Sequence, residues 1–211
     1  MRLAIFGANG RTGRELAQQA LDRGYAVTAV VRDVAKMPLR NRALTLAPLG
    51  DLGDQRGVTR TLDGADAVLS GIGPRGRKDA PVATPAIGSI VSGLETAGLR
   101  RVIVVSAAPV APPPGDSLLN RRIPLPAISA LLKPVYDDLR AMESILAASG
   151  SDWTAFRPPK LTNGPVTGRY RTTIGSSVRR GYTVSRADLA HAMLEALDRP
   201  ETKGTVVGIA D

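Results

Sequence analysis

The chain has 211 residues, of which 43% are apolar, and it contains no cysteine and a single histidine. This length and apolar content suffice for one hydrophobic core, so we expect a single domain over 1–211. The lack of cysteine excludes disulfides, thiolate ligands and a cysteine nucleophile. One histidine does not support a multi-ligand zinc site, so no metal site is predicted.

The formal net charge of +9 raises the question of a nucleic-acid partner, because clustered Lys and Arg attract phosphate backbones. The basic residues form a few adjacent pairs, such as Arg100 with Arg101, but no long run, and aromatic residues make up only 3% of the chain. This pattern indicates an arginine-rich surface and predicts no nucleic-acid partner. A positive field would, however, favour an anionic cofactor and an acidic substrate.

No targeting or membrane segment is predicted from the sequence. The first apolar run, at 3–6, is far shorter than the roughly 7–15 residues of a signal-peptide core. No stretch approaches the roughly 20 apolar residues that cross a bilayer. We therefore expect a cytoplasmic protein with no membrane partner.

Short apolar runs alternate with helical patterns, which is typical of a parallel sheet covered by helices on both faces. Strands are predicted at 3–6, 26–31, 43–47, 67–70, 101–105, 152–156 and 205–209. Helices are predicted at 12–23, 55–62, 84–97, 134–148 and 186–198, and a pair of short strands at 170–174 and 182–184. The prediction is an α/β fold: a three-layer, doubly wound parallel sheet of the Rossmann type.

Two segments are assigned to the substrate side. Residues 107–126 contain six prolines, which are too many for regular structure, and a loop of this length in a compact domain is more often a functional lid than a spacer. Residues 157–185 follow a predicted strand and are expected to border the same site.

The strongest motif is the glycine-rich segment between the first predicted strand and helix. Gly7 permits a tight turn, Gly10 lets backbone N–H groups approach a pyrophosphate, and Gly13 allows close packing of helix against strand. The helix N-terminus adds unpaired donors and a positive dipole end. The segment therefore predicts dinucleotide binding, and we assign Asn9, Arg11 and Thr12 to the same site.

The end of the second predicted strand indicates which nicotinamide cofactor fits. An acidic residue there would hold the ribose hydroxyl of NAD, whereas an arginine accommodates the 2′-phosphate of NADP. Arg32 comes first and Asp33 second. Because a guanidinium can bind phosphate bidentately, NADP(H) is the preferred cofactor, with Arg11 as a second cation. Asp33 keeps NAD(H) as the alternative.

Two later loops complete the predicted cofactor site. Asp51 and Leu52 follow the third strand, where such folds place an acidic side chain near the adenine amine. Gly71, Ile72 and Gly73 follow the fourth strand, where the glycines would let the backbone pass close to the nicotinamide ribose.

The Gly-x-x-Gly-x-x-Gly spacing, together with the segments VVRD, VIVVSA, SGSDWTAFRPP and PVTGRY, resembles the biliverdin-IXβ reductase/flavin reductase group of NmrA-like, atypical short-chain reductases. The resemblance implies one NADPH-binding domain, monomeric or homodimeric, that transfers a hydride to flavins, quinones or linear tetrapyrroles. It implies that Ser106 lies beside the nicotinamide and that Pro158 borders the cofactor. Lys160 occupies the place of a histidine in the mammalian flavin reductase.

Ser106, Lys160 and Tyr136 are the candidate catalytic residues. Ser106 could donate a hydrogen bond to the substrate or to the nicotinamide amide. Lys160 suits anchoring of an acidic substrate better than proton exchange, because a lysine ammonium normally keeps its proton at neutral pH. Tyr136 and Arg140 resemble the Tyr-x-x-x-Lys pair of short-chain dehydrogenases, but arginine cannot act as a proton reservoir.

Three functions agree with these residues. The first is an NADPH-dependent reductase of a conjugated small molecule, which needs little acid–base chemistry from the protein. The second is a non-catalytic NADP(H)-sensing regulator, and the third is a ketoreductase, epimerase or dehydratase that relies on Tyr136. The arginines at 169, 171, 179 and 180 are interpreted as a solvated basic face.

Overall fold

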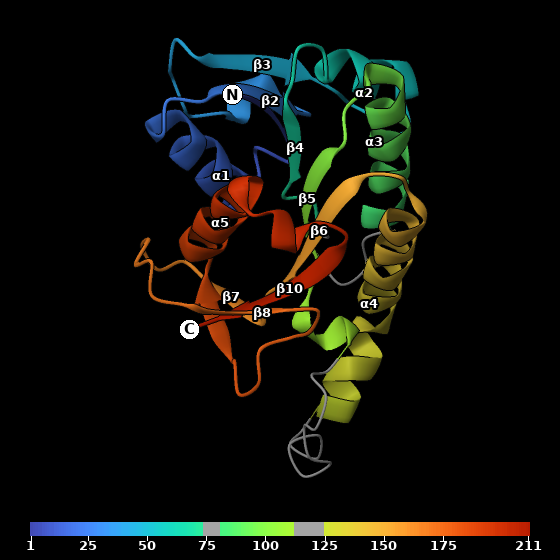
Figure 1. The fold of residues 1–211 in the computed structure, drawn as a ribbon, viewed down its shortest axis with the longest axis vertical. Helices are drawn as coiled ribbons and strands as arrows, with labels where there is room; N and C mark the ends of the chain where they lie inside the picture. The colour runs from blue at the N-terminus through green and yellow to red at the C-terminus, as the bar shows by residue number, and fades with distance from the viewer. Residues whose placement is uncertain (74–80, 112–124) are drawn as a thin grey trace.

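The computed structural model describes residues 1–73, 81–111 and 125–211, and these ranges form a mostly parallel eight-stranded sheet with helices on both faces (Figure 1). In spatial order the strands are β3 (Leu44–Pro48), β2 (Ala26–Val31), β1 (Arg2–Phe6), β4 (Ala67–Ser70), β5 (Arg101–Val105), β6 (Asp152–Arg157), β10 (Thr205–Ala210) and β8 (Arg171–Ile174). Only β8 is antiparallel to its neighbour. β7 (Lys160–Thr162) and β9 (Thr183–Ser185) form a separate parallel pair.

The helices divide between the two faces of the sheet (Figure 1). α1 (Arg11–Asp22) and α5 (Arg186–Glu195) cover one face, and α2 (Gln55–Thr61), α3 (Ala83–Ala97) and α4 (Leu125–Ala148) cover the other. Short 3₁₀ helices follow β2 (η1, Val34–Lys36), β5 (η2, Ala108–Val110) and α5 (η3, Ala196–Asp198; η4, Pro200–Thr202). None of the described helices combines the length and apolar character needed to cross a bilayer.

Each central strand contributes alternate side chains to two hydrophobic cores. In β1, Leu3 and Ile5 pack toward α1 and α5, whereas Ala4 and Phe6 pack toward α2, α3 and α4. Burial on both faces explains why the central strands read as continuous apolar runs in the sequence. It also confirms the predicted α/β fold with a doubly wound, mostly parallel sheet.

The strand order reverses direction between β1 and β4, which is where open α/β sheets bind ligands. The register pairs Phe6 with Ser70 and Ser70 with Val104. The loops that follow β1, β4 and β5 therefore emerge side by side at the carboxyl edge of the sheet. Neighbouring strands lie about 4.8 Å apart, so three loops span only about 10 Å.

The predicted pairing of 170–174 with 182–184 is wrong. β8 instead pairs with β10, with Ile174 opposite Val207, and β9 pairs with β7. Sequence pattern marks a segment as extended but does not identify its partner, and β7, which follows two prolines, was not predicted at all. One of the two predicted strands, β8, lies at the edge of the main sheet beside β10. The other, β9, pairs with β7, which follows β6.

The predicted start of the fourth long helix at residue 134 is also wrong, because α4 begins at Leu125. Pro126 lies in its first turn, where a backbone N–H has no intrahelical partner and proline is tolerated. Pro134 lies inside the helix and is exposed. Most of the predicted lid, residues 112–124, lies outside the described residues. The helix predicted over 186–198 ends as an α-helix at Glu195 and continues as η3.

Candidate functional site

The glycine-rich loop between β1 and α1 is built by close contact of backbone with backbone. Gly7 has a φ of 72°, and its carbonyl accepts the N–H of Gly10 at 2.8 Å. A Cβ on Gly13 would collide with the carbonyl oxygen of Gly7. A Cβ on Gly71, from the loop after β4, would lie 3.0 Å from the nitrogen of Gly13. The loops after β1 and β4 thus touch along their main chains.

The N-terminus of α1 has no side-chain cap, and its N-cap residue is Gly10. The starts of three other described helices are capped by side-chain oxygens. Asp54 caps α2, Ser185 caps α5, and Asp138 of α4 accepts the first N–H groups of α3. The first-turn donors of α1 therefore remain available to an anion, with the positive end of the helix dipole behind them.

Asn9 joins the glycine-rich loop to the end of β2. Its Nδ2 donates to the carbonyl oxygen of Asp33 at 2.7 Å. Its Oδ1 is buried and has no hydrogen-bond partner among the described residues. A buried acceptor without a partner is costly, so this atom fits a donor group on a bound ligand, such as a ribose hydroxyl or an adenine amine.

The two charged residues after β2, Arg32 and Asp33, differ in their contacts with the rest of the chain. The Asp33 carboxylate pairs with Lys36 at 3.1 Å and accepts the N–H of Ala35, and these contacts lower the pKa of Asp33. It therefore caps its own turn. Arg32 is exposed and forms no ion pair with any other described residue. Within the described residues its guanidinium is free at the position where the sequence predicts NAD and NADP to be distinguished.

A further cation, Arg186, stands near Arg11 at the start of α1. Arg186 begins α5 and is half-buried, and its guanidinium donates to the carbonyl oxygens of Leu161 and Thr162. Burial, and then the charge of Arg11, lower the pKa of Arg186. No sequence signal predicts this proximity, because the two arginines lie 175 positions apart and approach each other only through the packing of α1 against α5.

Asp51 and Leu52 follow β3, and Gly71, Ile72 and Gly73 follow β4. Asp51 Oδ1 accepts the N–H of Gly53 at 2.8 Å, forming a local turn, and Leu52 packs on the core beneath α3. The Ile72 N–H donates to the Ser70 hydroxyl at 3.4 Å, and the Ile72 side chain packs on the same core. Gly73 is exposed.

Ser106 and Pro158 are brought together by the chains that continue past β5 and β6. The Ser106 N–H donates to the carbonyl oxygen of Phe156 at 2.7 Å, and the Ala108 N–H donates to that of Pro158 at 2.8 Å. Ser106 and Pro158 are both buried. The two strand ends thus form one wall at the carboxyl edge.

Ser106 also belongs to a buried charged cluster that sequence reasoning missed. Its hydroxyl donates to Glu143 Oε1 of α4 at 2.6 Å. The Glu143 carboxylate receives two further hydrogen bonds from Arg157 of β6, at 3.0 and 2.6 Å. The two charged side chains are only 11% and 12% exposed. One signal was available: Glu143 lies seven residues after Tyr136, on the same helix face.

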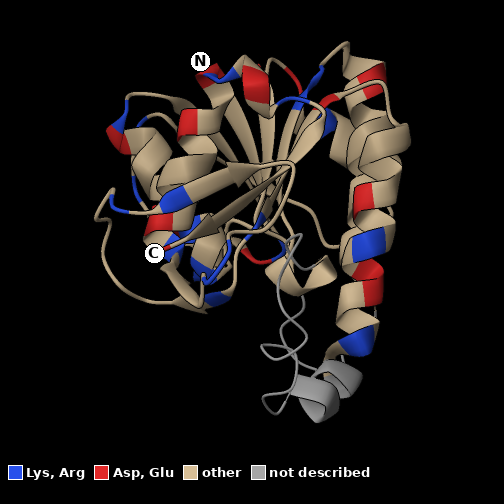
Figure 2. Cartoon of the chain, turned by 60° about the horizontal axis from the view of Figure 1, so that its bottom comes forward, with Lys and Arg blue, Asp and Glu red and all other residues tan. Residues whose placement is uncertain are grey.

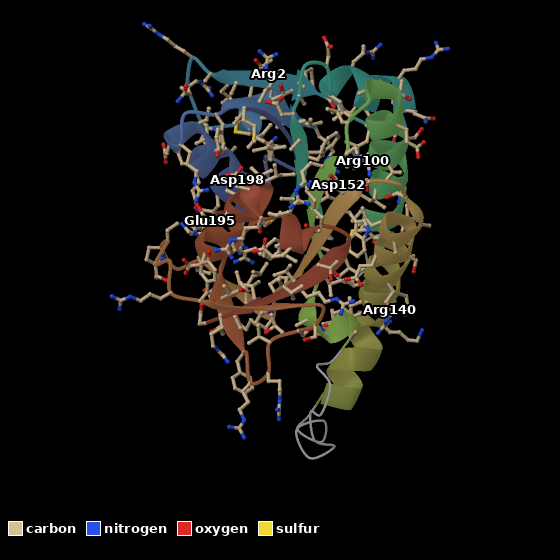
Figure 3. All side chains as sticks on the ribbon, viewed as in Figure 1. Arg2, Arg100, Arg140, Asp152, Glu195 and Asp198 are labelled. Carbon is tan, nitrogen blue, oxygen red and sulfur yellow. The ribbon has the colours of Figure 1, made fainter. Side chains whose placement is uncertain are left out.

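Tyr136 and Arg140 lie one turn apart on α4, and the Arg140 guanidinium makes its hydrogen bonds to other residues. Burial raises the pKa of Tyr136, so its hydroxyl holds its proton more tightly than usual. Arg140, labelled on α4 in Figure 3, donates to the carbonyl oxygen of Val110 and to the carboxylate of Asp137. No described hydrogen bond joins Tyr136 to Ser106.

Lys160 lies farther out than Ser106. It is exposed at the start of β7, and its backbone N–H donates to the carbonyl oxygen of Tyr182 at 3.2 Å. Tyr182 itself is 74% exposed. Two exposed residues, Lys160 and Tyr182, are therefore joined through their backbones on the segments that follow Pro158.

Comparison with known proteins agrees with this geometry. Residues 7–200 match the family described as NAD(P)H-binding. The chain is 27% identical over 217 residues to "Uncharacterized sugar epimerase YhfK" of Bacillus subtilis (strain 168), an alignment that covers 100% of this chain and 94% of that protein.

Two solved structures share the fold. One is ChuY, an anaerobillin reductase from Escherichia coli O157:H7, with a TM-score of 0.80 and 22% identity over 100% of this chain and 97% of that chain. The other is a wide-type short-chain dehydrogenase/reductase from Veillonella parvula DSM 2008 in complex with NADP, with a TM-score of 0.79 and 20% identity over 100% of this chain and 94% of that chain.

The contact between Gly13 and Gly7 gives a direct test of the loop. In Gly13→Ala the new methyl group must push the Gly7 carbonyl away, so we expect about 1–3 kcal/mol of destabilisation and at least a roughly tenfold loss of NADPH affinity. Gly88→Ala is the matched control, since a Cβ at Gly88 in α3 meets no atom within 4 Å. Calorimetric titration and thermal unfolding of both variants measure the effects; equal NADPH affinity in the two variants would contradict the assignment.

Proposed function

The chain belongs to the NAD(P)H-binding family, and we propose that it is an NADPH-dependent reductase of flavins, quinones or related conjugated small molecules. The observation that carries the proposal is the position of the Ser106–Glu143–Arg157 cluster. It lies at the same carboxyl edge of the sheet as the glycine-rich loop, two strands away from it. The nicotinamide end of a dinucleotide bound by that loop would lie beside this cluster.

The bound cofactor would supply a hydride to the acceptor, and a proton from water would complete the two-electron reduction, leaving the oxidised cofactor. The uncapped first turn of α1 would bind the pyrophosphate. Asn9 Oδ1 would accept a hydrogen bond from the adenosine part. These residues hold and orient the cofactor, which is the main contribution a protein makes to hydride transfer.

Ser106 would act as a hydrogen-bond acceptor. Its hydroxyl hydrogen is directed to Glu143, so the oxygen lone pairs are what it can offer to a ligand. The amino group of the nicotinamide carboxamide is a donor that fits them. Arg157 keeps the Glu143 carboxylate in place through two hydrogen bonds. Glu143 and Arg157 are thus positioning residues for Ser106.

A conjugated acceptor fits this site better than a ketone or an alcohol does. Carbonyl chemistry in short-chain dehydrogenases needs a tyrosine that exchanges its proton easily, whereas the pKa of Tyr136 is raised by burial. Arg140 is engaged with Val110 and Asp137. A flavin or quinone delocalises the incoming negative charge over its own rings, so its reduction needs less acid–base catalysis from the protein. The reductase named ChuY supports this class, and the name of YhfK supports the alternative of an epimerase.

We propose NADP(H) rather than NAD(H) as the cofactor. Arg32 is exposed and free for a 2′-phosphate, and Asp33 is occupied by Lys36 and Ala35. The NADP bound in the Veillonella parvula structure supports the same choice.

The function is tested by following NADPH oxidation at 340 nm with FMN, menadione or biliverdin as acceptor. We expect turnover with at least one acceptor. Tyr136→Phe should keep most of it, because burial holds the proton on Tyr136 and no described hydrogen bond joins Tyr136 to Ser106, Glu143 or Arg157. Tight NADPH binding without turnover would favour the regulatory alternative. Ketone or sugar turnover that Tyr136→Phe abolishes would favour the epimerase or ketoreductase alternative.

The Ser106 cluster is tested by Glu143→Gln, which removes the carboxylate and leaves the Arg157 guanidinium buried without a counter-charge. We expect about 3–5 kcal/mol of destabilisation and a roughly tenfold fall in kcat. The double variant Glu143→Gln/Arg157→Met removes the unpaired charge, so stability should recover while kcat stays low. Glu95→Gln, exposed on α3, is the matched control. Recovery of kcat together with stability would mean that the pair is only structural.

The cofactor choice is tested by Arg32→Gln. Losing a charge-assisted contact to the 2′-phosphate should weaken NADPH binding by about 1.5–3 kcal/mol, or roughly 10- to 100-fold. NADH lacks that phosphate, so its affinity should not change, and it serves as the internal control. Calorimetry with both cofactors gives the ratio, and a parallel loss for NADH and NADPH would refute the role of Arg32.

A further inference from the structure

The positive charge of the chain is concentrated in one segment on the substrate side. Residues 157–186 contain no Asp or Glu but seven Lys and Arg residues, which carry most of the net charge of +9. In Figure 2, Lys and Arg positions are grouped on the loops near the C-terminus, at the carboxyl edge of the sheet. The seven cations are Arg157, Lys160, Arg169, Arg171, Arg179, Arg180 and Arg186.

Most of these cations have no counter-charge within the described residues. Arg157 is paired with Glu143, and Arg171 donates to the carbonyl oxygens of Arg179, Arg180 and Asp211. The side chains of four others are exposed and make no hydrogen bond or ion pair to another described residue. These four are Lys160, Arg169, Arg179 and Arg180.

Two of the arginines line a pocket of about 490 Å³ between β8 and the segment 176–179. Thr173 and Ser176 add hydroxyl groups to the wall that Arg171 and Arg179 form. Arg171 fixes the shape of the segment, because its guanidinium holds the carbonyl oxygens of Arg179 and Arg180 at 3.1 and 3.3 Å. The Ser176 hydroxyl donates to the carbonyl oxygen of Ser177 at 3.4 Å, so the Arg179 guanidinium and the Thr173 hydroxyl remain for a ligand.

The pocket is tied directly to the chain that carries Ser106. Ser177, which lines the pocket, is buried, and its hydroxyl lies 3.2 and 3.0 Å from the carbonyl oxygens of Ala108 and Ala111. Ala108 follows Ser106 by two residues, a distance of about 7 Å at most between Cα atoms. On the other side, Gly208 of β10 lies opposite Arg157 and donates to the carbonyl oxygen of Ser176 at 3.0 Å.

We propose that the acceptor reduced at Ser106 carries a phosphate or carboxylate group, and that the pocket lined by Arg171, Thr173, Ser176 and Arg179 binds that group. The inference rests on the reductase function proposed above and adds the charge of the substrate and its binding site. Guanidinium and hydroxyl groups donate the hydrogen bonds that phosphate and carboxylate groups accept. Residues 157–186 contribute seven positive charges and no negative one, so their net field is positive. Glu143, Asp188 and Asp211, which accept hydrogen bonds from Arg157, Thr167 and Thr183, offset part of that charge.

The test uses pairs of acceptors that share a ring system and differ in charge. FMN and riboflavin differ by a phosphate, and biliverdin and its dimethyl ester differ by two carboxylates. We expect the charged member of at least one pair to have a roughly tenfold lower KM with a similar kcat, consistent with one charge-assisted contact. Arg179→Gln should remove that advantage and leave the uncharged member unaffected.

Arg42→Gln is the matched control, because it removes the same charge from an exposed arginine at the amino edge of the sheet, before β3. It should leave all four KM values unchanged. Which pair shows the effect identifies the anion as phosphate or carboxylate. Equal KM values within both pairs, or an equal effect of Arg42→Gln and Arg179→Gln, would overturn the proposal.

A binding measurement separates this proposal from the reductase function. Flavin fluorescence follows binding of FMN and riboflavin to the NADP⁺-loaded protein without turnover. Tighter binding of FMN that is lost in Arg179→Gln would support the pocket even if no acceptor were reduced. Absence of turnover would refute only the reductase function, whereas equal binding of FMN and riboflavin, together with equal binding of biliverdin and its dimethyl ester to the NADP⁺-loaded protein, would refute the pocket.

Discussion

The site depends on one constraint, the close approach of the main chains of Gly7, Gly13 and Gly71 where the strand order reverses. Because Gly13 has no side chain, the first turn of α1 can pack directly against the Gly7 carbonyl at the end of β1. This places an uncapped helix N-terminus at the carboxyl edge of the sheet. Asn9 then ties the loop to the end of β2, which orients the charged residues there relative to the helix. The cofactor site follows from packing that a single methyl group would disturb.

The second constraint is the buried ion pair of Glu143 and Arg157. Removing two charges from water is costly, and an apolar pair of similar volume would often serve stability as well. A structural role alone therefore does not explain its presence beside Ser106. The carboxylate gives the Ser106 hydroxyl hydrogen a fixed partner, which determines what the oxygen offers to a ligand. The pair also joins α4 to β6, so the helix that carries Tyr136 is anchored to the same strand end as Pro158.

The sequence predicted most of the fold and about half of the candidate site, and the division has a physical cause. Apolar runs and glycine spacing are local signals, so the strands, the doubly wound sheet and the loop from Gly7 to Gly13 could be read directly. Arg186 could not be predicted, because Arg11 lies 175 positions away and approaches it only after packing. For Glu143 the only signal was its spacing from Tyr136, because its partners Ser106 and Arg157 meet it only in the packed structure. The partner of β8 was missed for the same reason. Proline is a poor signal for the absence of a helix at the start of α4, because the first turn of a helix tolerates it.

The fold separates the two anionic groups that the proposed reaction brings to the protein, namely the phosphates of the cofactor and the anionic group of the acceptor. The dinucleotide phosphates would meet α1, Arg11 and Arg32 on the β1–β2 side of the strand reversal, and the acceptor's anionic group would meet the arginines beyond β10. Two anions bound within a few ångströms would repel each other in a site of low polarity. Because several strands lie between the two sites, each anionic group can be bound by its own cations, while the neutral rings of the cofactor and the acceptor meet at Ser106. The antiparallel strand β8 extends the sheet on that side, and Arg171 on this strand shapes the pocket wall.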